Sequence, residues 1–276
     1  MDLCYRLWNM GIAELSSSAQ DYLKVIWDLQ EWDKGPVQPT AVAERTGMKQ
    51  STVSGALGRL VDAGLVTHRP YGKVELTETG RRYAVIMVRR HRLLETFLVQ
   101  VLGYGWDEVH EEADSLEHAV SDKMVDRIDD YLGHPTADPH GDAIPGEDGN
   151  MPPIPRTEVL ADVKPGMVVQ VRRISDENPD LLRYLTRYGL GPGSILRVRH
   201  LGRNGNQPMI SLDLMLSAGL GTPTHGCLLI QDGQKEKTAE PYHAELLGNE
   251  RKPRPITVEL TADQALRIQV CPLTTG

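Results

Sequence analysis

The sequence predicts a mainly helical N-terminal part that contains a winged helix-turn-helix, followed by a small all-β barrel domain. Apolar residues recur at helical spacing up to about residue 132. A segment rich in Pro, Gly and Asp covers residues 133–155, and short runs of alternating apolar and polar residues follow it. The chain of 276 residues exceeds the usual size of one compact domain. We therefore expect two or three domains.

Capping residues and apolar spacing define three helices in the first quarter of the chain. The first helix is expected to start after Ser16–Ser18 and to end at Gly35-Pro36. Thr40 is expected to cap a short helix over residues 41–45, and a third helix is expected from about Gln50 to Ala63. The buried side of that third helix is predicted to comprise Val53, Leu57, Leu60, Val61 and Leu65.

Two short β-like runs, residues 65–68 and 74–76, follow the third helix and enclose a basic tip with Pro and Gly. Helices followed by such a hairpin are typical of a winged helix-turn-helix, whose recognition helix projects polar groups into the major groove of DNA. An ordinary three-helix bundle is the alternative. The residues expected to contact DNA are Lys49, Gln50, Ser51, Thr52, Ser54, Arg59, Arg69 and Lys73.

A long helix is predicted from about Glu78 to Val101, and an acidic helix over about residues 107–132. On the acidic helix, spacings of four, three and one residues should gather four polar side chains on one face. They are His110, Asp114, Glu117 and His118. Upstream, His91 and Glu95 lie one helical turn apart. Nitrogen and oxygen donors without thiolates suit a hard or borderline divalent cation, whereas a solvated acidic helix is the alternative.

The net charge of −8 hides a strong local asymmetry. Residues 45–92 contain ten Lys or Arg and three acids, whereas residues 93–150 contain two basic residues and fifteen acids. The pattern favours a polyanion-binding unit beside a cation-binding unit, and two solvated faces of opposite sign are the alternative. Cys4, Cys227 and Cys271 form no metal-spaced cluster, which fits a reducing cytoplasm. No apolar run is long enough for a membrane helix.

The last part of the chain shows short strand-like runs separated by turn signals. They cover residues 167–171, 194–199 and 256–260. We expect a small β-barrel with one short helix over residues 180–188. Residues 203–255, rich in Gly, Pro and Asn, are expected to be an insertion without clear periodicity.

Eight short motifs occur in a characteristic order along the chain. They are Asp21-Tyr-Leu-Lys24, Thr52-Val-Ser54, Asp62-Ala-Gly-Leu-Val66, Leu76-Thr-Glu-Thr-Gly80, Arg90-His-Arg-Leu-Leu-Glu95, Val109-His-Glu-Glu-Ala113, Glu117-His118 and Pro139-His-Gly-Asp-Ala-Ile-Pro-Gly146. Together they resemble the diphtheria-toxin-repressor family of metal-dependent transcriptional regulators. The resemblance covers roughly residues 16–202, resumes weakly near residues 256–270, and is closest to the manganese-responsive branch.

The resemblance implies four parts. These are an N-terminal extension (1–15), a winged helix-turn-helix domain (16–88), a helical dimerisation and metal-binding domain (89–150), and a domain similar to SH3 and FeoA domains (151–276) with an insertion at about 203–255. It also implies that the first helix and the acidic helix together supply a primary metal site, formed by Asp21, Asp114, Glu117 and His118. An ancillary site is implied at His91, Glu95 and His110, with Glu177 and Asp180 as weaker candidates from the barrel.

The donor types imply which metal is bound. Iron-responsive members of the family have Met and Cys at the positions of Asp21 and Asp114. Replacing sulfur by carboxylate oxygen favours Mn²⁺. Fe²⁺ is the alternative, and Zn²⁺, Co²⁺ or Cd²⁺ are expected to substitute in vitro. Compact manganese-type members have an acid where this chain has Lys24, which argues against their two-metal cluster here and favours the ancillary arrangement.

The function that the resemblance implies is a cytoplasmic, homodimeric, Mn²⁺-activated repressor of metal-uptake genes. Its partner would be double-stranded palindromic operator DNA, and neither a membrane nor a small-molecule substrate is expected. An Fe²⁺-responsive repressor of the same family is one alternative. A metallohydrolase that uses the His, Asp and Glu cluster is another, although the sequence contains no HExxH motif or nucleophile elbow.

Overall fold

The computed structural model describes residues 12, 15–33, 35, 37–68, 72–153, 155–204, 207–216 and 256–273. The chain separates into two compact units, Met1–Ile154 and Pro155–Gly276. Most of the predicted extension over residues 1–15 lies outside the described residues, as do residues 217–255 of the predicted insertion. No helix among the described residues is long and apolar enough to cross a membrane.

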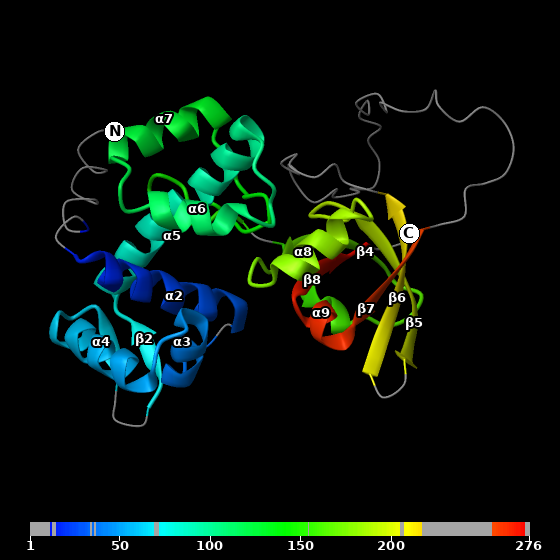
Figure 1. The fold of residues 1–276 in the computed structure, drawn as a ribbon, viewed down its shortest axis with the longest axis horizontal. Helices are drawn as coiled ribbons and strands as arrows, with labels where there is room; N and C mark the ends of the chain where they lie inside the picture. Colours follow the sequence, from blue (N-terminus) through cyan, green and yellow to red (C-terminus); the bar gives the residue numbers. More distant parts are fainter. Residues whose placement is uncertain are drawn as a thin grey trace, which may run out of the picture. The chain divides into compact units, whose positions relative to one another are not determined.

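Residues 15–76, as far as they are described, form three helices and a small two-stranded sheet, which lie together in Figure 1. The elements are α2 (Ser17–Asp33), α3 (Pro39–Thr46), α4 (Gln50–Asp62), β1 (Val66–His68) and β2 (Val74–Leu76). The two strands pair antiparallel, with Val66 opposite Leu76. The predicted helical region with a helix-turn-helix is therefore confirmed.

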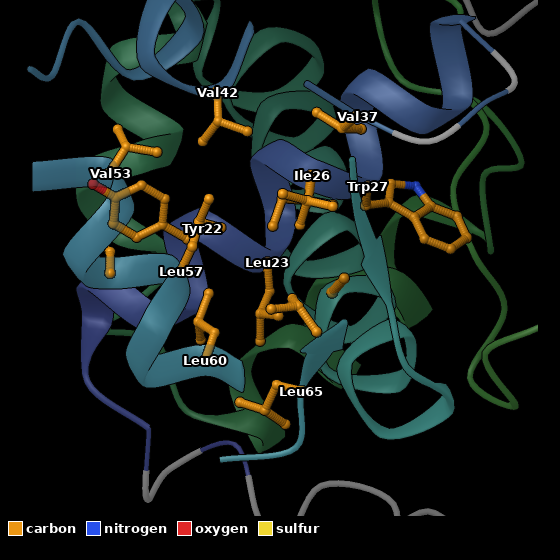
Figure 2. Close-up of a cluster of buried hydrophobic side chains, with 14 of the residues drawn as sticks. Tyr22, Leu23, Ile26, Trp27, Val37, Val42, Val53, Leu57, Leu60 and Leu65 are labelled. Carbon is orange, nitrogen blue, oxygen red and sulfur yellow. The ribbon is translucent and has the colours of Figure 1, made fainter. Parts of the chain in front are cut away.

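One buried cluster joins these elements, and Figure 2 shows its side chains pointing toward one another. Leu23 and Ile26 of α2 are fully buried and pack with Val42 of α3 and Leu57 of α4. Burying a side chain of this size stabilises the fold by about 1.5–3 kcal/mol. The cluster therefore fixes α4, the expected recognition helix, on the rest of the unit.

Two local predictions about these helices are wrong. The short helix begins at Pro39, with Gln38 as its N-cap, and not after Thr40. Proline suits the first helical turn because its fixed φ matches the helix and no N–H is needed there. Val61, predicted to be buried, is 37% exposed. It follows Leu60 directly, so the same helix turn that buries Leu60 directs Val61 outward.

The long helix α5 (Glu78–Leu102) leads to α6 (Val109–Leu116) and α7 (Asp122–Leu132). The predicted single acidic helix over residues 107–132 is therefore wrong. Its break has a local cause: the Ser121 side chain caps α7 by accepting a hydrogen bond from the Met124 backbone N–H. Both helices pack on α5, and in Figure 1 they lie at the opposite end of α5 from α4.

Gly80 allows α5 to approach closely the backbone of Leu65, the residue just before β1. The Thr77 hydroxyl caps α5 by accepting a 3.0 Å hydrogen bond from the Gly80 N–H, and it donates to the Leu65 carbonyl at 3.1 Å. A Cβ atom on Gly80 would lie 1.8 Å from that carbonyl oxygen. The backbone would therefore have to move to accept any larger residue at this position.

Gly80→Ala is expected to lower the free energy of unfolding by about 1–3 kcal/mol, as overpacking of a tight contact does. Urea unfolding followed by circular dichroism measures the effect. Gly58→Ala is the matched control, because its Cβ would meet no atom within 4 Å and α4 would gain about 0.5–1 kcal/mol. Equal effects of the two substitutions would contradict the close approach at Gly80.

The described residues of the second unit form a six-stranded antiparallel sheet in the order β3-β8-β4-β5-β6-β7. Its elements are β3 (Glu158–Val159), a 3-10 turn (Leu160–Asp162), β4 (Val168–Ile174), α8 (Pro179–Thr186), β5 (Ile195–Asn204), β6 (Gln207–Leu216), β7 (Ile256–Thr261), α9 (Ala262–Leu266) and β8 (Ile268–Pro272). The prediction of a small all-β domain is confirmed.

Within this sheet, β6 and α9 correct the sequence-based prediction. Residues 207–216 were assigned to the insertion, but they form β6, which pairs with both β5 and β7. Its alternation of buried Ile210, Leu212 and Leu214 is a strand pattern partly masked by the surrounding Gly, Pro and Asn. The prediction of a single helix in this domain is wrong, because a second short helix, α9, follows β7 and is capped by the Thr261 side chain.

Candidate metal centre

The candidate metal ligands of the first unit come from four places in the chain. Asp21 lies on α2, and His91 and Glu95 lie on α5. His110 and Asp114 lie on α6. Glu117 and His118 follow α6, Glu117 as its C-cap, so they do not share one helix face with His110 and Asp114 as the spacing predicted. The folded chain still gathers these side chains, in two neighbouring clusters.

The first cluster joins α2 to the turn after α6. The Nε2 atom of His118 lies 2.7 Å from Asp21 Oδ1 and 3.6 Å from Glu117 Oε1. One donor atom from each of these three residues lies within 4.8 Å of the other two. Two carboxylates and an imidazole at such distances fit a hard or borderline divalent cation. We call Asp21, Glu117 and His118 the primary cluster.

Gln20 orients the imidazole of His118, and sequence reasoning missed it. Its Oε1 lies 2.9 Å from His118 Nδ1, while its amide nitrogen donates to the carbonyls of Ile12 and Leu15 at 2.9 and 3.0 Å. These two donations fix the amide, so its oxygen faces the ring. A proton on Nδ1 leaves the Nε2 lone pair for a metal, as is usual for metal-binding histidines.

The second cluster lies between α5 and α6. His91 Nε2 is 3.0 Å from Glu95 Oε1 and 3.2 Å from His110 Nδ1, and that His110 atom is 3.3 Å from Glu95 Oε1. Glu95 and His91 are buried, which shields a bound cation from solvent. We call His91, Glu95 and His110 the ancillary cluster. Its donors also fit a divalent cation.

Glu177 and Asp180, the weaker ancillary candidates, belong to the second unit. There Glu177 accepts a 2.8 Å hydrogen bond from Arg267, and Asp180 accepts one of 2.7 Å from Arg183 on α8. Both carboxylates thus have a cationic partner within their own unit. Their assignment as metal ligands stays a prediction.

Asp114 lies between the two clusters. Its Oδ1 is 3.2 Å from His91 Nδ1, and its Oδ2 is 3.5 Å from His110 Nε2. A group formed by His91, Asp114 and Glu117 also brings its donor atoms within 4.8 Å of one another. The structure therefore places Asp114 with Glu117, but not in one close group with Asp21 and His118.

Lys24 lies at the centre of this arrangement. Its ammonium nitrogen is 2.7 Å from Asp114 Oδ1, 2.7 and 2.8 Å from the two oxygens of Glu117, and 3.2 Å from His91 Nδ1. Lys24 is buried, with 7% of its surface exposed. An acid-rich cluster in the interior is thus neutralised by a cation from α2.

The protonation states follow from these contacts. Burial alone would lower the pKa of Lys24, but Glu117 and Asp114 raise it above its ordinary value. Burial opposes ionisation of Glu117, yet its contacts with His91 and Lys24 hold the pKa of this carboxyl below its usual range. For His91, burial and Lys24 lower the pKa, but Glu95, Asp114 and Glu117 raise it well above the ordinary value. Without a metal, Lys24 and His91 therefore form a network of ion pairs with the surrounding carboxylates.

A further buried group, Glu95, Asp138 and His140, also brings donor atoms within 4.8 Å of one another. Asp138 accepts hydrogen bonds from the backbone N–H groups of His140 and Asp142 at 2.8 and 2.9 Å. The ring of His140 stacks on Trp106 and its Nε2 bonds the Trp106 carbonyl at 2.7 Å. These contacts fix the loop behind the ancillary cluster.

The predicted DNA-contacting residues lie on the surface of the first unit wherever they are described. Six of them flank or lie on α4 and are exposed, namely Lys49, Gln50, Ser51, Thr52, Ser54 and Arg59. Lys73, just before β2, is exposed as well. Arg69 lies outside the described residues. Their role in binding DNA stays a prediction.

Comparison with known proteins identifies the family. The chain is 30% identical over 195 residues to the diphtheria toxin repressor of Corynebacterium diphtheriae, which covers 67% of this chain and 85% of that repressor. The chain belongs to the diphtheria-toxin-repressor family. Family profiles agree: residues 14–74 match the N-terminal DNA-binding domain of iron-dependent repressors, residues 77–146 their metal-binding and dimerisation domain, and residues 159–213 the FeoA domain.

Two further similar proteins are repressors that depend on different metals, iron and manganese. The iron-dependent repressor IdeR of Mycobacterium tuberculosis (strain ATCC 25618 / H37Rv) is 39% identical over 133 residues, which span 48% of this chain and 57% of IdeR. A solved structure titled a manganese-dependent transcriptional repressor in complex with manganese is 43% identical. It has a TM-score of 0.73 and covers 92% of this chain and 100% of that one. The family consists of transcriptional repressors, so the metallohydrolase alternative is abandoned.

Proposed function

We propose that this chain is a Mn²⁺-activated, homodimeric DNA-binding repressor of metal-uptake genes. The observation that supports this function best is the primary cluster. In it, Asp21 of α2 faces Glu117 and His118, which directly follow α6. α2 packs against the expected recognition helix. A metal held by these three residues would therefore join the DNA-binding domain, residues 16–88, to the dimerisation and metal-binding domain, residues 89–150.

The donor set supports manganese. The primary cluster with Asp114 offers three carboxylates and one imidazole, and no sulfur. Oxygen donors suit Mn²⁺, and discrimination must come from ligand type and geometry because Mn²⁺ is the weakest binder of the divalent series. The likeness to a manganese-dependent transcriptional repressor that was solved with manganese supports this choice. The iron-dependent relatives favour Fe²⁺ as the second candidate.

Activation would work by selecting one domain arrangement. When Asp21 and His118 share a metal, the dimer is biased toward the arrangement in which both recognition helices fit successive major grooves, ~34 Å apart. Such spacing implies a palindromic operator. By linkage, operator DNA should tighten Mn²⁺ binding to the same extent that Mn²⁺ tightens DNA binding.

Exposed apolar side chains at the end of α5 and on α7 support a dimer interface there. Leu102 is 57% exposed, Met124 48% and Tyr131 72%. The two helices that carry these side chains pack on one another, and exposed apolar side chains on neighbouring helices are common on surfaces that another chain covers. A second copy of this chain is the expected partner.

A fluorescence-anisotropy titration of operator DNA tests the function. The protein is expected to bind in Mn²⁺ and to lose binding in chelator, at one fixed salt concentration because salt alone shifts affinity steeply. Parallel titrations with Fe²⁺ under anaerobic conditions and with Zn²⁺ establish which metal acts at the lowest concentration. Metal-independent binding would refute the proposal, and activation by Fe²⁺ at lower concentration than Mn²⁺ would favour the iron-responsive candidate.

A further inference from the structure

The Lys24 ammonium occupies the position that a cation would take among three metal-binding side chains. The donor atoms of His91, Asp114 and Glu117 lie within 4.8 Å of one another, and Lys24 Nζ contacts all three residues at 2.7–3.2 Å. These contacts involve both oxygens of Glu117. The group is therefore filled by a positive charge that belongs to the chain itself.

The contacts of Lys24 are strong because they are shielded from water. Glu117 is completely buried and Lys24 almost so. Attraction between opposite charges grows as the surrounding dielectric falls, and buried pairs are little screened by salt. Lys24 is carried by α2, which the buried side chains of Leu23 and Ile26 anchor in the core. Its ammonium is held by the contacts with Asp114, Glu117 and His91.

Glu117 belongs to two groups at once. It belongs to the primary cluster with His118 and Asp21, and it also pairs with Lys24. The same oxygen, Glu117 Oε1, lies 3.6 Å from His118 Nε2 and 2.7 Å from Lys24 Nζ. A metal ion that takes the Glu117 carboxylate must therefore draw electron density from oxygens that already bind an ammonium. Asp114 is shared in the same way, because its Oδ1 accepts from Lys24 at 2.7 Å.

We propose that Lys24 is a tethered cation that competes with the metal ion for Glu117 and Asp114 and so raises the metal concentration at which the primary site fills. This role of Lys24 rests on the proposed function in one respect, namely that Glu117 and Asp114 are ligands of the primary metal site. Lys24 thus determines the affinity threshold of the sensor, whereas the ligands determine which metal binds.

Removing this charge should tighten metal binding. Lys24→Met keeps an unbranched side chain in the buried space without the ammonium, and it should bind Mn²⁺ roughly tenfold more tightly. Lys24→Arg keeps the charge and should stay near the wild-type affinity. In the absence of metal, Lys24→Met should be less stable, because Glu117 and Asp114 have lost a cationic partner. Its Mn²⁺-induced rise in Tm should be larger than that of the wild type.

Metal affinity is measured on the full chain, stripped with chelator, by electron paramagnetic resonance of free Mn²⁺ without DNA. Lys164→Met, at an exposed lysine of the second unit, is the charge-matched control and should leave the affinity unchanged. Equal or weaker Mn²⁺ binding by folded Lys24→Met would overturn the proposal, because Lys24 would then help to position the ligands. Since no DNA is present, failure of the repressor function at the DNA step would leave this result intact.

A second measurement needs no substitution and so does not depend on folding of the variant. In the metal-free wild-type protein, the buried Lys24 ammonium should give a ¹⁵N signal with slowly exchanging protons. Titration with diamagnetic Zn²⁺ should shift that signal and speed its exchange, with the stoichiometry of the primary site. A Lys24 signal that is unchanged when the site is full would contradict competition.

Discussion

Glu117→Gln is expected to reduce Mn²⁺ affinity at the primary site by at least about 100-fold, because loss of an outer-shell partner alone costs 10–100-fold. Glu117 is completely buried, and its two oxygens lie 2.7–2.8 Å from Lys24 Nζ. One of them is also 2.7 Å from His91 Nδ1. Glutamine keeps the shape but replaces one oxygen by a donor that faces an ammonium. The neutral amide also offers no charge to a cation.

The experiment compares Mn²⁺ titrations of operator binding for the wild type and the variant, with circular dichroism to check that both are folded. Glu111→Gln is the matched control, because this acid lies exposed on α6 and its loss changes the charge equally. The control should keep the wild-type Mn²⁺ midpoint. An unchanged midpoint in folded Glu117→Gln protein would remove Glu117 from the primary site.

Most helices and the wing follow from local signals in the sequence. The Thr77 cap and the left-handed glycines Gly64 and Gly103 mark helix ends where the structure has them. Such signals act within a few residues, so they can be recognised in the sequence without knowledge of the tertiary structure. The end of α6 is different, because residues 117–121 contain neither Gly nor Pro and Ser121 is the sole local sign of a new helix.

The residues of the metal clusters could be predicted only in part, because local sequence signals do not show which distant residues meet in the fold. The family motifs pointed to Asp21, Glu117 and His118, although Asp21 and Glu117 lie 96 positions apart in the sequence. Neither Gln20, which contacts His118, nor the place of Lys24 inside the cluster has a sequence signal of its own. Both depend on how α2 packs against the rest of the unit. Contacts of this kind are set by the fold as a whole.

Arg92 is expected to be among the most important polar residues for the stability of the first unit. It is buried on α5, and its guanidinium forms a bidentate pair with Glu31 of α2 at 2.7 and 3.3 Å. It also donates to the Ala143 carbonyl at 2.6 Å. One side chain thus joins α2, α5 and the loop behind the ancillary cluster, whether or not a metal is bound.

Arg92→Ala is expected to cost about 3–5 kcal/mol, because removing one partner of a buried pair leaves the other charge uncompensated. At roughly 2–4 °C per kcal/mol for a unit of this size, Tm of the metal-free protein should fall by roughly 6–20 °C. Arg90→Ala is the control on the same helix. Its partner Asp122 is partly exposed, so the expected cost is about 1 kcal/mol or less. Arg92→Lys should fall between the two, because lysine keeps the charge but not the planar fork that binds Glu31 through two nitrogens. If Arg92→Ala proved no more destabilising than Arg90→Ala in calorimetry, the connection between α2 and the metal region would have to come from apolar packing and the primary cluster alone.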